Sequence, residues 1–246
     1  MDIVNLRRMA LMSANSGKKH VDSDGKILDS WDEIIASIDA NKYSKLYKVG
    51  DYKALDLGSE GIIDMQIVAM DADELTDGNG NAPLTFLSSY VLNNERQMHT
   101  ANNSSIYSAT SLNKWLNSTV LSLIPNNVKS RIVSVNKTFK TGTGTAIATD
   151  SFKIWIPSAR ELKETDTSLK ESSGVEYDIF STKWRRKKTH PDPTAYNVPS
   201  WWCYWTRTHS KSSSYQYRRC AGTDGAYRFN NNMTEYNYVC IGFCLG

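Results

Sequence analysis

The sequence predicts an α+β domain with two helices, a small mixed antiparallel sheet and long loops. Helical periodicity occurs at residues 31–42 and 111–124, and strand patterns occur separately, most clearly at 61–73 and 236–244. Helices and strands do not alternate along the chain as they do in parallel α/β proteins. Long polar connections separate the elements, which is unusual in a compact domain unless the connections are functional.

The first helix is predicted at residues 31–42. Ser30 precedes it and Glu33 stands three residues later, which is the spacing of a capping box. One helical face carries the apolar side chains of Trp31, Ile34, Ile35 and Ile38. Residues 1–28 are polar and weakly patterned, and they are predicted to be a tail or connector to the folded domain at 29–246.

The region after this helix is predicted to be rich in strands. Two short strand-like runs flank Gly50-Asp51 within residues 46–57 and predict a β-hairpin. Residues 61–73 follow as a strong strand. Its apolar face is formed by Ile63, Met65, Ile67 and Ala69. The polar segment 76–83 is predicted to be a loop, and residues 84–92 another strand.

The second helix is predicted at residues 111–124. Either Thr110 or Ser111 can act as its N-cap, and Pro125 ends it. The polar residues 93–109 that precede it are predicted to form a loop.

The middle of the chain is predicted to mix short elements. Residues 126–141 indicate a short helix that runs into a strand, and residues 151–157 indicate a further strand. Ser158 is predicted to start a short helix over 159–164, and the polar residues 164–200 are predicted to form a long excursion.

The composition is that of a globular protein, since 40% of the residues are hydrophobic and 22% are charged. A net charge of +3 is too small to imply nucleic-acid binding by itself, so no nucleic-acid partner is predicted. No apolar run approaches the roughly 18 residues of a membrane-spanning helix, so membrane insertion is not predicted. The N-terminal segment lacks the apolar core of a signal peptide, so conventional secretion is not expected.

All of the cysteines lie near the C-terminus: Cys203, Cys220, Cys240 and Cys244. Reduced, buried thiols are favoured, and a structural disulfide remains an alternative. A zinc site is disfavoured, because the spacings lack the paired short knuckles of common zinc sites.

No metalloprotease, P-loop or nucleophile-elbow motif occurs, so no catalytic residue, metal or cofactor is predicted. Surface positions are expected for three histidines in polar stretches: His99, His190 and His209. A solvated turn, rather than a cation site, is favoured for the acidic residues Asp71, Asp73 and Glu74. The basic run 184–188 is interpreted as a solvated loop rather than a phosphate site.

The C-terminal segment 201–246 combines a strand pattern with clustered tyrosine, asparagine, serine and arginine, the residue types of antibody-like binding surfaces. In residues 236–244, Val239, Ile241 and Phe243 alternate toward a core. The other face, with Tyr236, Tyr238 and Cys240, should therefore meet solvent. The predicted ligand-contact residues are Tyr204, Thr206, His209, Ser213, Tyr215, Tyr217, Arg219, Tyr227, Phe229, Asn231, Asn232, Tyr236 and Tyr238.

Four stretches carry a family resemblance. They are YKVGDYKAL (47–55), the block from Ala109 to Lys137, FKIWIPSARE (152–161), and the ending with YWTRT, CAGTDG and VCIGFCL. In this order they resemble a domain family of uncharacterised function from gut bacteria and their phages. That family looks related to the C-type-lectin-like fold of the variable proteins of diversity-generating retroelements.

The resemblance implies a ligand-binding display protein and not an enzyme. In those variable proteins a reverse transcriptase copies a template with errors at adenines, which converts Asn codons to Tyr, Ser, Asp and similar codons. The implied role is phage or prophage receptor binding, on the virion or in the bacterial cytoplasm before release. The expected partner is a cell-surface protein or glycan, and a homo-oligomer would add avidity.

Two alternatives remain open at this point. Formylglycine-generating enzymes resemble the same fold, and Cys240 with Cys244 could be proposed as their copper-binding pair. The tyrosine-rich face could instead be an interface in a structural or assembly protein. Calcium-dependent sugar binding is not implied, because neither Glu-Pro-Asn nor Gln-Pro-Asp occurs in the sequence.

Overall fold

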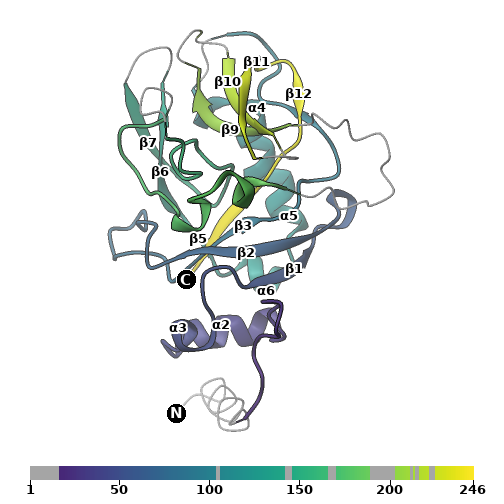
Figure 1. Ribbon diagram of the computed structural model, residues 1–246, viewed down its shortest axis with the longest axis vertical. Helices are drawn as coiled ribbons and strands as arrows, with labels where there is room; N and C mark the ends of the chain where they lie inside the picture. Colours follow the sequence, from purple (N-terminus) through teal and green to yellow (C-terminus); the bar gives the residue numbers. More distant parts are fainter. Residues whose placement is uncertain are drawn as a thin grey trace.

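The computed structural model describes residues 17–103, 106–141, 146–165, 170–188, 203–210, 213, 216–221 and 225–246. At the centre of the described residues lies a six-stranded antiparallel sheet in the order β1-β2-β3-β13-β5, with β8 also paired to β13 (Figure 1). Its strands are β1 (Tyr52–Asp56), β2 (Ile62–Met70), β3 (Leu84–Ser88), β5 (Ile132–Val133), β8 (Ile154–Trp155) and β13 (Gly242–Leu245).

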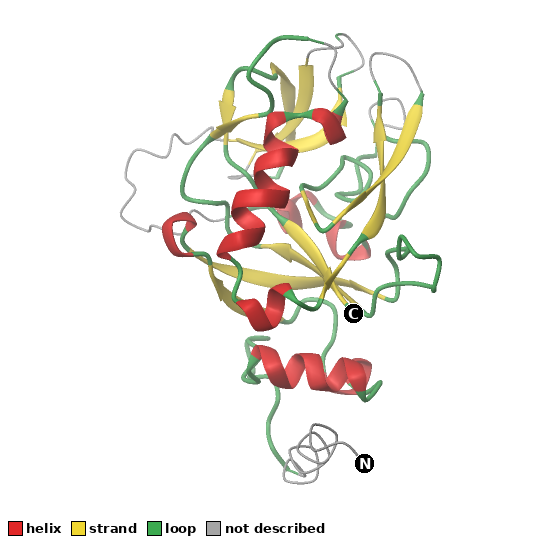
Figure 2. Cartoon of the chain, turned by 180° about the vertical axis from the view of Figure 1, so that it is seen from behind, coloured by secondary structure: helices red, strands yellow, loops and turns green. Residues whose placement is uncertain are grey.

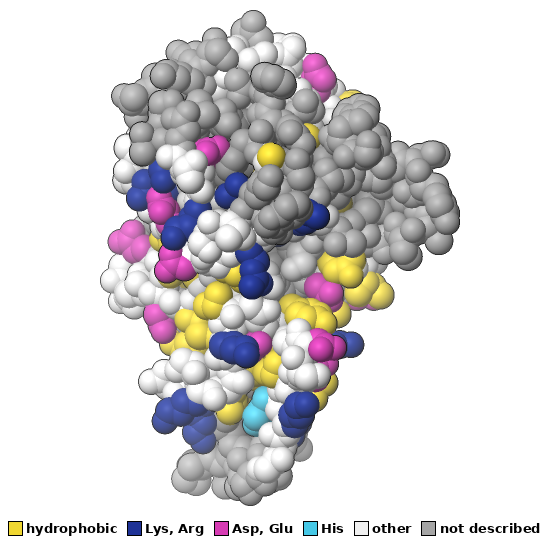
Figure 3. All heavy atoms as spheres, viewed as in Figure 1, with side chains coloured by type: hydrophobic (Ala, Val, Ile, Leu, Met, Phe, Trp, Pro, Cys, Tyr) yellow, Lys and Arg dark blue, Asp and Glu magenta, His cyan; other side chains and the backbone are white. Residues whose placement is uncertain are grey.

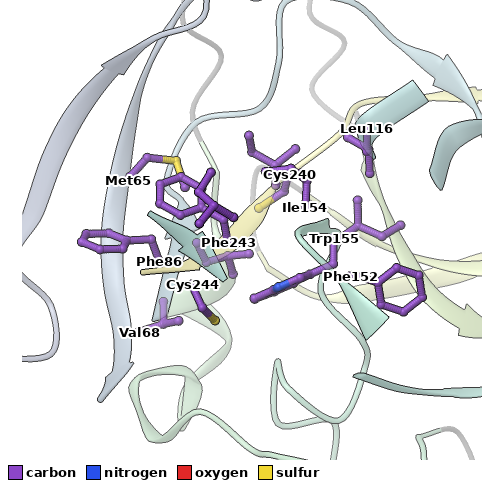
Figure 4. Packing of buried hydrophobic residues seen from close by; sticks show 14 of the residues in the cluster. Met65, Val68, Phe86, Leu116, Phe152, Ile154, Trp155, Cys240, Phe243 and Cys244 are labelled. Atoms are coloured by element: carbon purple, nitrogen blue, oxygen red, sulfur yellow. The ribbon is translucent and has the colours of Figure 1, made fainter. Parts of the chain in front are cut away.

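The C-terminal strand β13 lies inside this sheet. It pairs with β3 along one edge, and with β8 and then β5 along the other. Phe243 of β13 stands opposite Phe86 of β3 with ring centroids 5.5 Å apart, and both side chains are fully buried (Figure 4). The end of the chain is therefore part of the core.

The first helix covers one face of the sheet. Helix α2 (Trp31–Asp39) begins after Ser30, and both reciprocal hydrogen bonds of the predicted capping box with Glu33 are present. The ring of Trp31 packs 5.5 Å from that of Phe86, which attaches the helix to β3. Figure 2 shows α2 with α3 (Tyr43–Leu46) at one end of the molecule, beyond the central sheet.

The predicted hairpin around Gly50-Asp51 is wrong. The predicted first strand does not form, because helix α3 ends at Leu46 and no strand follows over residues 47–50, and β1 pairs with β2 across the turn η1 (Gly58–Glu60). The physical reason is that the turn bonds to β2: Gly50 donates to the carbonyl of Ile67, whose own N–H donates to the carbonyl of Asp51.

The second helical run is capped by Thr110, whose hydroxyl accepts a hydrogen bond from the N–H of Asn113 at 3.2 Å. The run consists of α4 (Ser111–Trp115), the π-helical turn η3 (Leu116–Val120) and α5 (Leu121–Leu123), and α6 (Asn126–Lys129) follows after Pro125. The buried stripe on this run is formed by Leu112, Leu116 and Val120. The predicted helix and its end are confirmed.

Smaller sheets form a second layer above the central one. They are a three-stranded sheet of β9 (Cys203–His209), β10 (Gln216–Ala221) and β11 (Tyr227–Asn232), the pair β4 (Arg96–Gln97) with β12 (Tyr236–Asn237), and the pair β6 (Val135–Lys140) with β7 (Ile147–Phe152). The short 3-10 helices are η2 (Tyr107–Ala109), η4 (Asp178–Phe180) and η5 (Lys183–Arg186).

Several connections differ from the prediction. Residues 159–163 form a turn rather than a helix, and the predicted loop 93–109 contains β4 and η2. The folded part begins before residue 29, because Ile27 is fully buried and Lys18 forms an ion pair with Asp29 at 2.9 Å.

The architecture is α+β, as predicted. The helices and the antiparallel strands form separate blocks, and the described sheets are curled rather than flat (Figures 1 and 2). None of the helices in the described residues has the length and apolar character that a membrane crossing requires.

Candidate functional site

Four of the predicted contact residues are buried, so their predicted exposure is wrong. Tyr204, Thr206 and Tyr217 have no exposed surface, and His209 is only 1% exposed. Strand β9 is buried at every position: β10 and the bridge from Tyr204 to Tyr238 occupy its edges, and β6 also packs against it. Side chains along a strand point alternately to its two faces, and one of these faces meets solvent only if no second layer covers it.

The interior contacts of these residues agree with a packing role. The hydroxyl of Tyr204 donates to the carbonyl of Arg186 at 2.9 Å. The ring of Tyr217 lies 4.2 Å from that of His209 on the neighbouring strand. The expected surface position of His209 is therefore wrong as well.

The face predicted from Tyr236, Tyr238 and Cys240 is exposed only at Tyr236. Tyr236 is 61% exposed, whereas Asn237 is 3% exposed and Tyr238 is half-buried. Cys240 has no exposed surface, so its predicted solvent position is wrong. The strand β12 ends at Asn237, and its alternation cannot be extended to Cys240, whose thiol donates to the carbonyl of Ser88.

A smaller candidate surface remains, which we call the amide–tyrosine face. It is formed by Gln97, Gln216, Asn231, Asn232, Tyr236 and Tyr238, each exposed or half-buried. A tight turn joins β11 to β12, since the N–H of Glu235 donates to the carbonyl of Asn232 at 2.9 Å. Gln97 stands opposite Tyr236 in the β4–β12 pair, and Gln216 stands opposite Asn232 in the β10–β11 pair.

The amides of this face are held in place by hydrogen bonds. Gln216 Nε2 donates to Asn232 Oδ1 at 2.9 Å, and Gln97 Nε2 donates to the carbonyl of Thr234 at 2.6 Å. Beneath them, Met233 is fully buried, and its carbonyl accepts from the N–H of His99. The exposed groups thus stand on a fixed frame, which lowers the entropy lost when a ligand is bound.

The remaining predicted contact residues are only partly described. Tyr215 lies outside the described residues. The side chains of Arg219, Tyr227 and Phe229 also lie outside the description, although their backbones belong to β10 and β11. Ser213 is half-buried.

A second cluster, which was not predicted, is a buried charge network. Its members are each at most 2% exposed: Asp73, Lys137, Glu161, Tyr177 and Arg207. Lys137 Nζ donates to Asp73 Oδ1 at 2.5 Å, to Glu161 Oε1 at 2.9 Å and to the hydroxyl of Tyr177 at 2.7 Å. Arg207 Nη1 donates to Glu161 Oε2 at 2.6 Å. The predicted solvated turn is therefore wrong for Asp73.

The ion pairs overcome the cost of burial in this network. Burial opposes the charge on Lys137, but the carboxylates of Asp73 and Glu161 outweigh it and raise the pKa of Lys137. Burial also opposes ionisation of Glu161, but Arg207 and Lys137 hold its pKa at about 2. The ring of Trp155 lies 3.7 Å from Lys137 Nζ and adds a cation–π contact.

The sequence contains one local indication of the network, the position of Lys137 in its strand. Lys137 stands between Val135 and Phe139, which are the buried positions of β6, so strand alternation directs its side chain inward. A lysine on an apolar face requires a buried partner. Its partners Asp73 and Glu161 lie far away in sequence, and no local pattern identifies them.

The described cysteines are free, buried thiols, as predicted. Burial raises the pKa of Cys220 to about 12 and also raises the pKa of Cys244. The Cys240 thiol donates to Ser88, whereas that of Cys244 lies near Thr85 and Asp73. Across the described residues there is no group of three or more His, Cys, Asp or Glu side chains that could hold a metal ion.

The basic run 184–188 is less solvated than predicted. Lys188 is 7% exposed, and its ammonium donates to the carbonyl of Ser88 at 2.5 Å. On the face drawn in Figure 3, basic and acidic side chains of the described residues are interspersed.

Residues 83–245 match a family described as a domain of unknown function, DUF6273. The chain belongs to the DUF6273 family. No curated protein and no solved structure matches the chain. The DUF6273 region runs from the start of β3 to the end of β13, and it includes the whole amide–tyrosine face. It also includes Lys137, Glu161 and Arg207, whereas Asp73 precedes it.

Proposed function

We propose that this protein is a ligand-binding display protein whose amide–tyrosine face recognises a cell-surface glycan or protein. The observation that carries the proposal is Tyr236. Its side chain is 61% exposed, while its neighbours Met233 and Val239 are fully buried. Other large hydrophobic side chains that are exposed in the described residues are aliphatic: Leu28, Val49 and Ile62.

The chemistry of the face suits recognition. A fixed tyrosine supplies contact area with little loss of side-chain entropy, and the surrounding amides can both donate and accept hydrogen bonds. Asn232 opens the tight turn that leads to Tyr236, and Asn231 precedes it in β11. A few such anchors supply most of the binding free energy in typical interfaces.

The finer architecture proposed for the domain is C-type-lectin-like. Three features support it: two separate helical blocks, a C-terminal strand inside the central sheet, and a small second sheet that carries the tyrosine- and asparagine-rich residues. By resemblance to the variable proteins of diversity-generating retroelements, we propose a phage or prophage receptor-binding role with a diversified C-terminal face. Flanking DNA with a reverse transcriptase and a near-copy of the C-terminal coding sequence would test the diversification.

The binding proposal is tested with a glycan array and with whole bacterial cells, comparing the wild type with Tyr236→Ala. We expect the variant to lose at least about tenfold in affinity, because hot-spot truncations cost about 2 kcal/mol or more. The matched control is Leu28→Ala. Leu28 is 48% exposed and lies two residues before Ser30, the N-cap of α2. Helix α2 and strand β12 lie at opposite ends of the molecule (Figure 1). Equal binding by Tyr236→Ala and the control would contradict the assignment of the face.

A further inference from the structure

A cavity of about 360 Å³ opens above the buried charge network. It lies between the β6–β7 pair, the loop at Asp73 and Glu74, and residues 173–175. Its described lining residues are Ala72, Asp73, Glu74, Asn136, Lys137, Thr138, Thr149, Glu161, Ser173, Gly174, Val175 and Arg207. Apart from Ala72, Gly174 and Val175, the lining residues have side chains that can form hydrogen bonds, so the cavity suits a small polar molecule.

The floor of the cavity offers one free hydrogen-bond donor. Arg207 is 1% exposed, and it donates from Nε to Thr138 and from Nη1 to Ile156 and Glu161. Within the described residues its Nη2 has no acceptor. Lys137 has no comparable capacity, because its three N–H groups already meet Asp73, Glu161 and Tyr177. A guanidinium N–H group of a residue that lines a cavity suits a carboxylate.

The mouth of the cavity offers a hydrogen-bond acceptor, the carboxylate of Glu74. Glu74 is exposed, and its Oε2 accepts a hydrogen bond from Asn136 Nδ2 at 3.0 Å. The remaining acceptor capacity of this carboxylate suits a cationic group. Thr149 and Ser173 are exposed beside it and add hydroxyl groups.

We propose that this cavity binds a small zwitterion of the free α-amino acid class, with its carboxylate on Arg207 and its ammonium on Glu74. The volume equals that of about twelve waters in the liquid, so the cavity has room for a small amino acid together with several waters. Inorganic phosphate fits poorly, because it brings only negative charge to a cavity lined by the carboxylates of Asp73, Glu74 and Glu161, whereas a zwitterion also brings a cation. A sugar fits poorly, because the described lining residues include no aromatic ring to stack on it.

This site is independent of the proposed recognition function. The β6–β7 pair and strand β12 lie on opposite sides of the β9–β10 sheet in both ribbon views (Figures 1 and 2). The amide–tyrosine face and the cavity share no residue. Each can therefore fail its test without affecting the other.

The test is titration calorimetry of the full chain with glycine, L-alanine, L-serine and L-glutamate at millimolar concentrations. Propionate, ethylamine, inorganic phosphate and glucose serve as comparison probes. We expect at least one amino acid to saturate the protein and to bind more tightly than propionate or ethylamine, each of which lacks one of its charges. Absence of saturation by every amino acid, or tighter binding of phosphate or glucose, would overturn the proposal.

Two surface variants locate the binding. Glu74→Gln should weaken binding of the amino acid about tenfold and leave that of propionate unchanged, because the variant removes the charge that assists the hydrogen bond from the ammonium. Thr149→Trp should block the mouth and abolish binding, while the far-ultraviolet circular dichroism stays that of the wild type. The matched control is Glu95→Gln, an exposed carboxyl outside the cavity lining, which should bind as the wild type does. Equal binding by Glu74→Gln, Thr149→Trp and the control would place the amino acid elsewhere.

Discussion

Lys137 Nζ lies 2.5 Å from Asp73 Oδ1, although 64 residues separate them in sequence. This ion pair joins β6 to the loop between β2 and β3. Because Glu161 and Arg207 extend it, the same network also reaches the turn after β8 and the buried strand β9. The two layers of the domain are therefore connected through charges in their interior.

The first prediction concerns the loss of Lys137. Lys137→Met leaves the carboxylates of Asp73 and Glu161 buried without their shared cation, so the free energy of unfolding should fall by about 3–5 kcal/mol. Urea denaturation followed by tryptophan fluorescence measures the change. The matched control is Lys163→Met, since Lys163 pairs with Asp178 on the surface, and it should change stability by less than about 1 kcal/mol. An equal loss in the free energy of unfolding for both variants would show that burial of the network adds nothing to stability.

The second prediction concerns acid. The pKa of Glu161 is held at about 2 in the folded protein, below its ordinary value of 4.5. The unfolded chain therefore binds the proton first, and the contribution of Glu161 to stability is present above pH 4.5 and lost as the pH falls toward 2. Glu161→Gln should be less stable at neutral pH and should lose less stability across this acid range.

Stability curves at a series of pH values check the acid prediction. The matched control is Glu235→Gln, an exposed carboxyl at the turn before β12, which should keep the acid dependence of the wild type. An unchanged acid dependence in Glu161→Gln would contradict the assigned pKa.

The third prediction concerns the thiols. The cysteines Cys203, Cys220, Cys240 and Cys244 are free and buried, and burial raises the pKa of Cys220 to about 12. Because the thiolate is the reactive form, the native protein should react only slowly with Ellman's reagent near neutral pH. The protein denatured in guanidinium chloride, without a reductant, should release all four thiols rapidly. Release of only two would indicate a disulfide instead.

Much of the local structure could be predicted because its causes are local. The capping box at Ser30 and Glu33, the N-cap at Thr110 and the alternating face of β2 depend on residues a few positions apart. Each of these predictions is confirmed. The same locality explains the false hairpin at Gly50-Asp51, where the turn was recognised but its hydrogen bonds go to β2.

The candidate sites depend on contacts that no short segment contains. Tyr204 and Tyr236 are both predicted contact residues in strand patterns, yet one is fully buried and the other is 61% exposed. The difference arises because β9 lies inside the second layer, whereas β12 lies at its edge beside β4. The buried charge network likewise draws Asp73, Lys137 and Glu161 from three separate segments.

The last prediction concerns Gly242 at the start of β13. A Cβ atom there would collide with the six-membered part of the Trp155 ring on β8, although the backbone of Gly242 lies outside the left-handed region and would accept other residues. Gly242→Ala should therefore lower the free energy of unfolding by about 1–3 kcal/mol through overpacking. The shorter ring of Trp155→Phe should relieve this collision, so Gly242→Ala should cost less in that background. A double-mutant cycle by urea denaturation measures the coupling, and strictly additive effects would show that the ring is not the reason for the glycine.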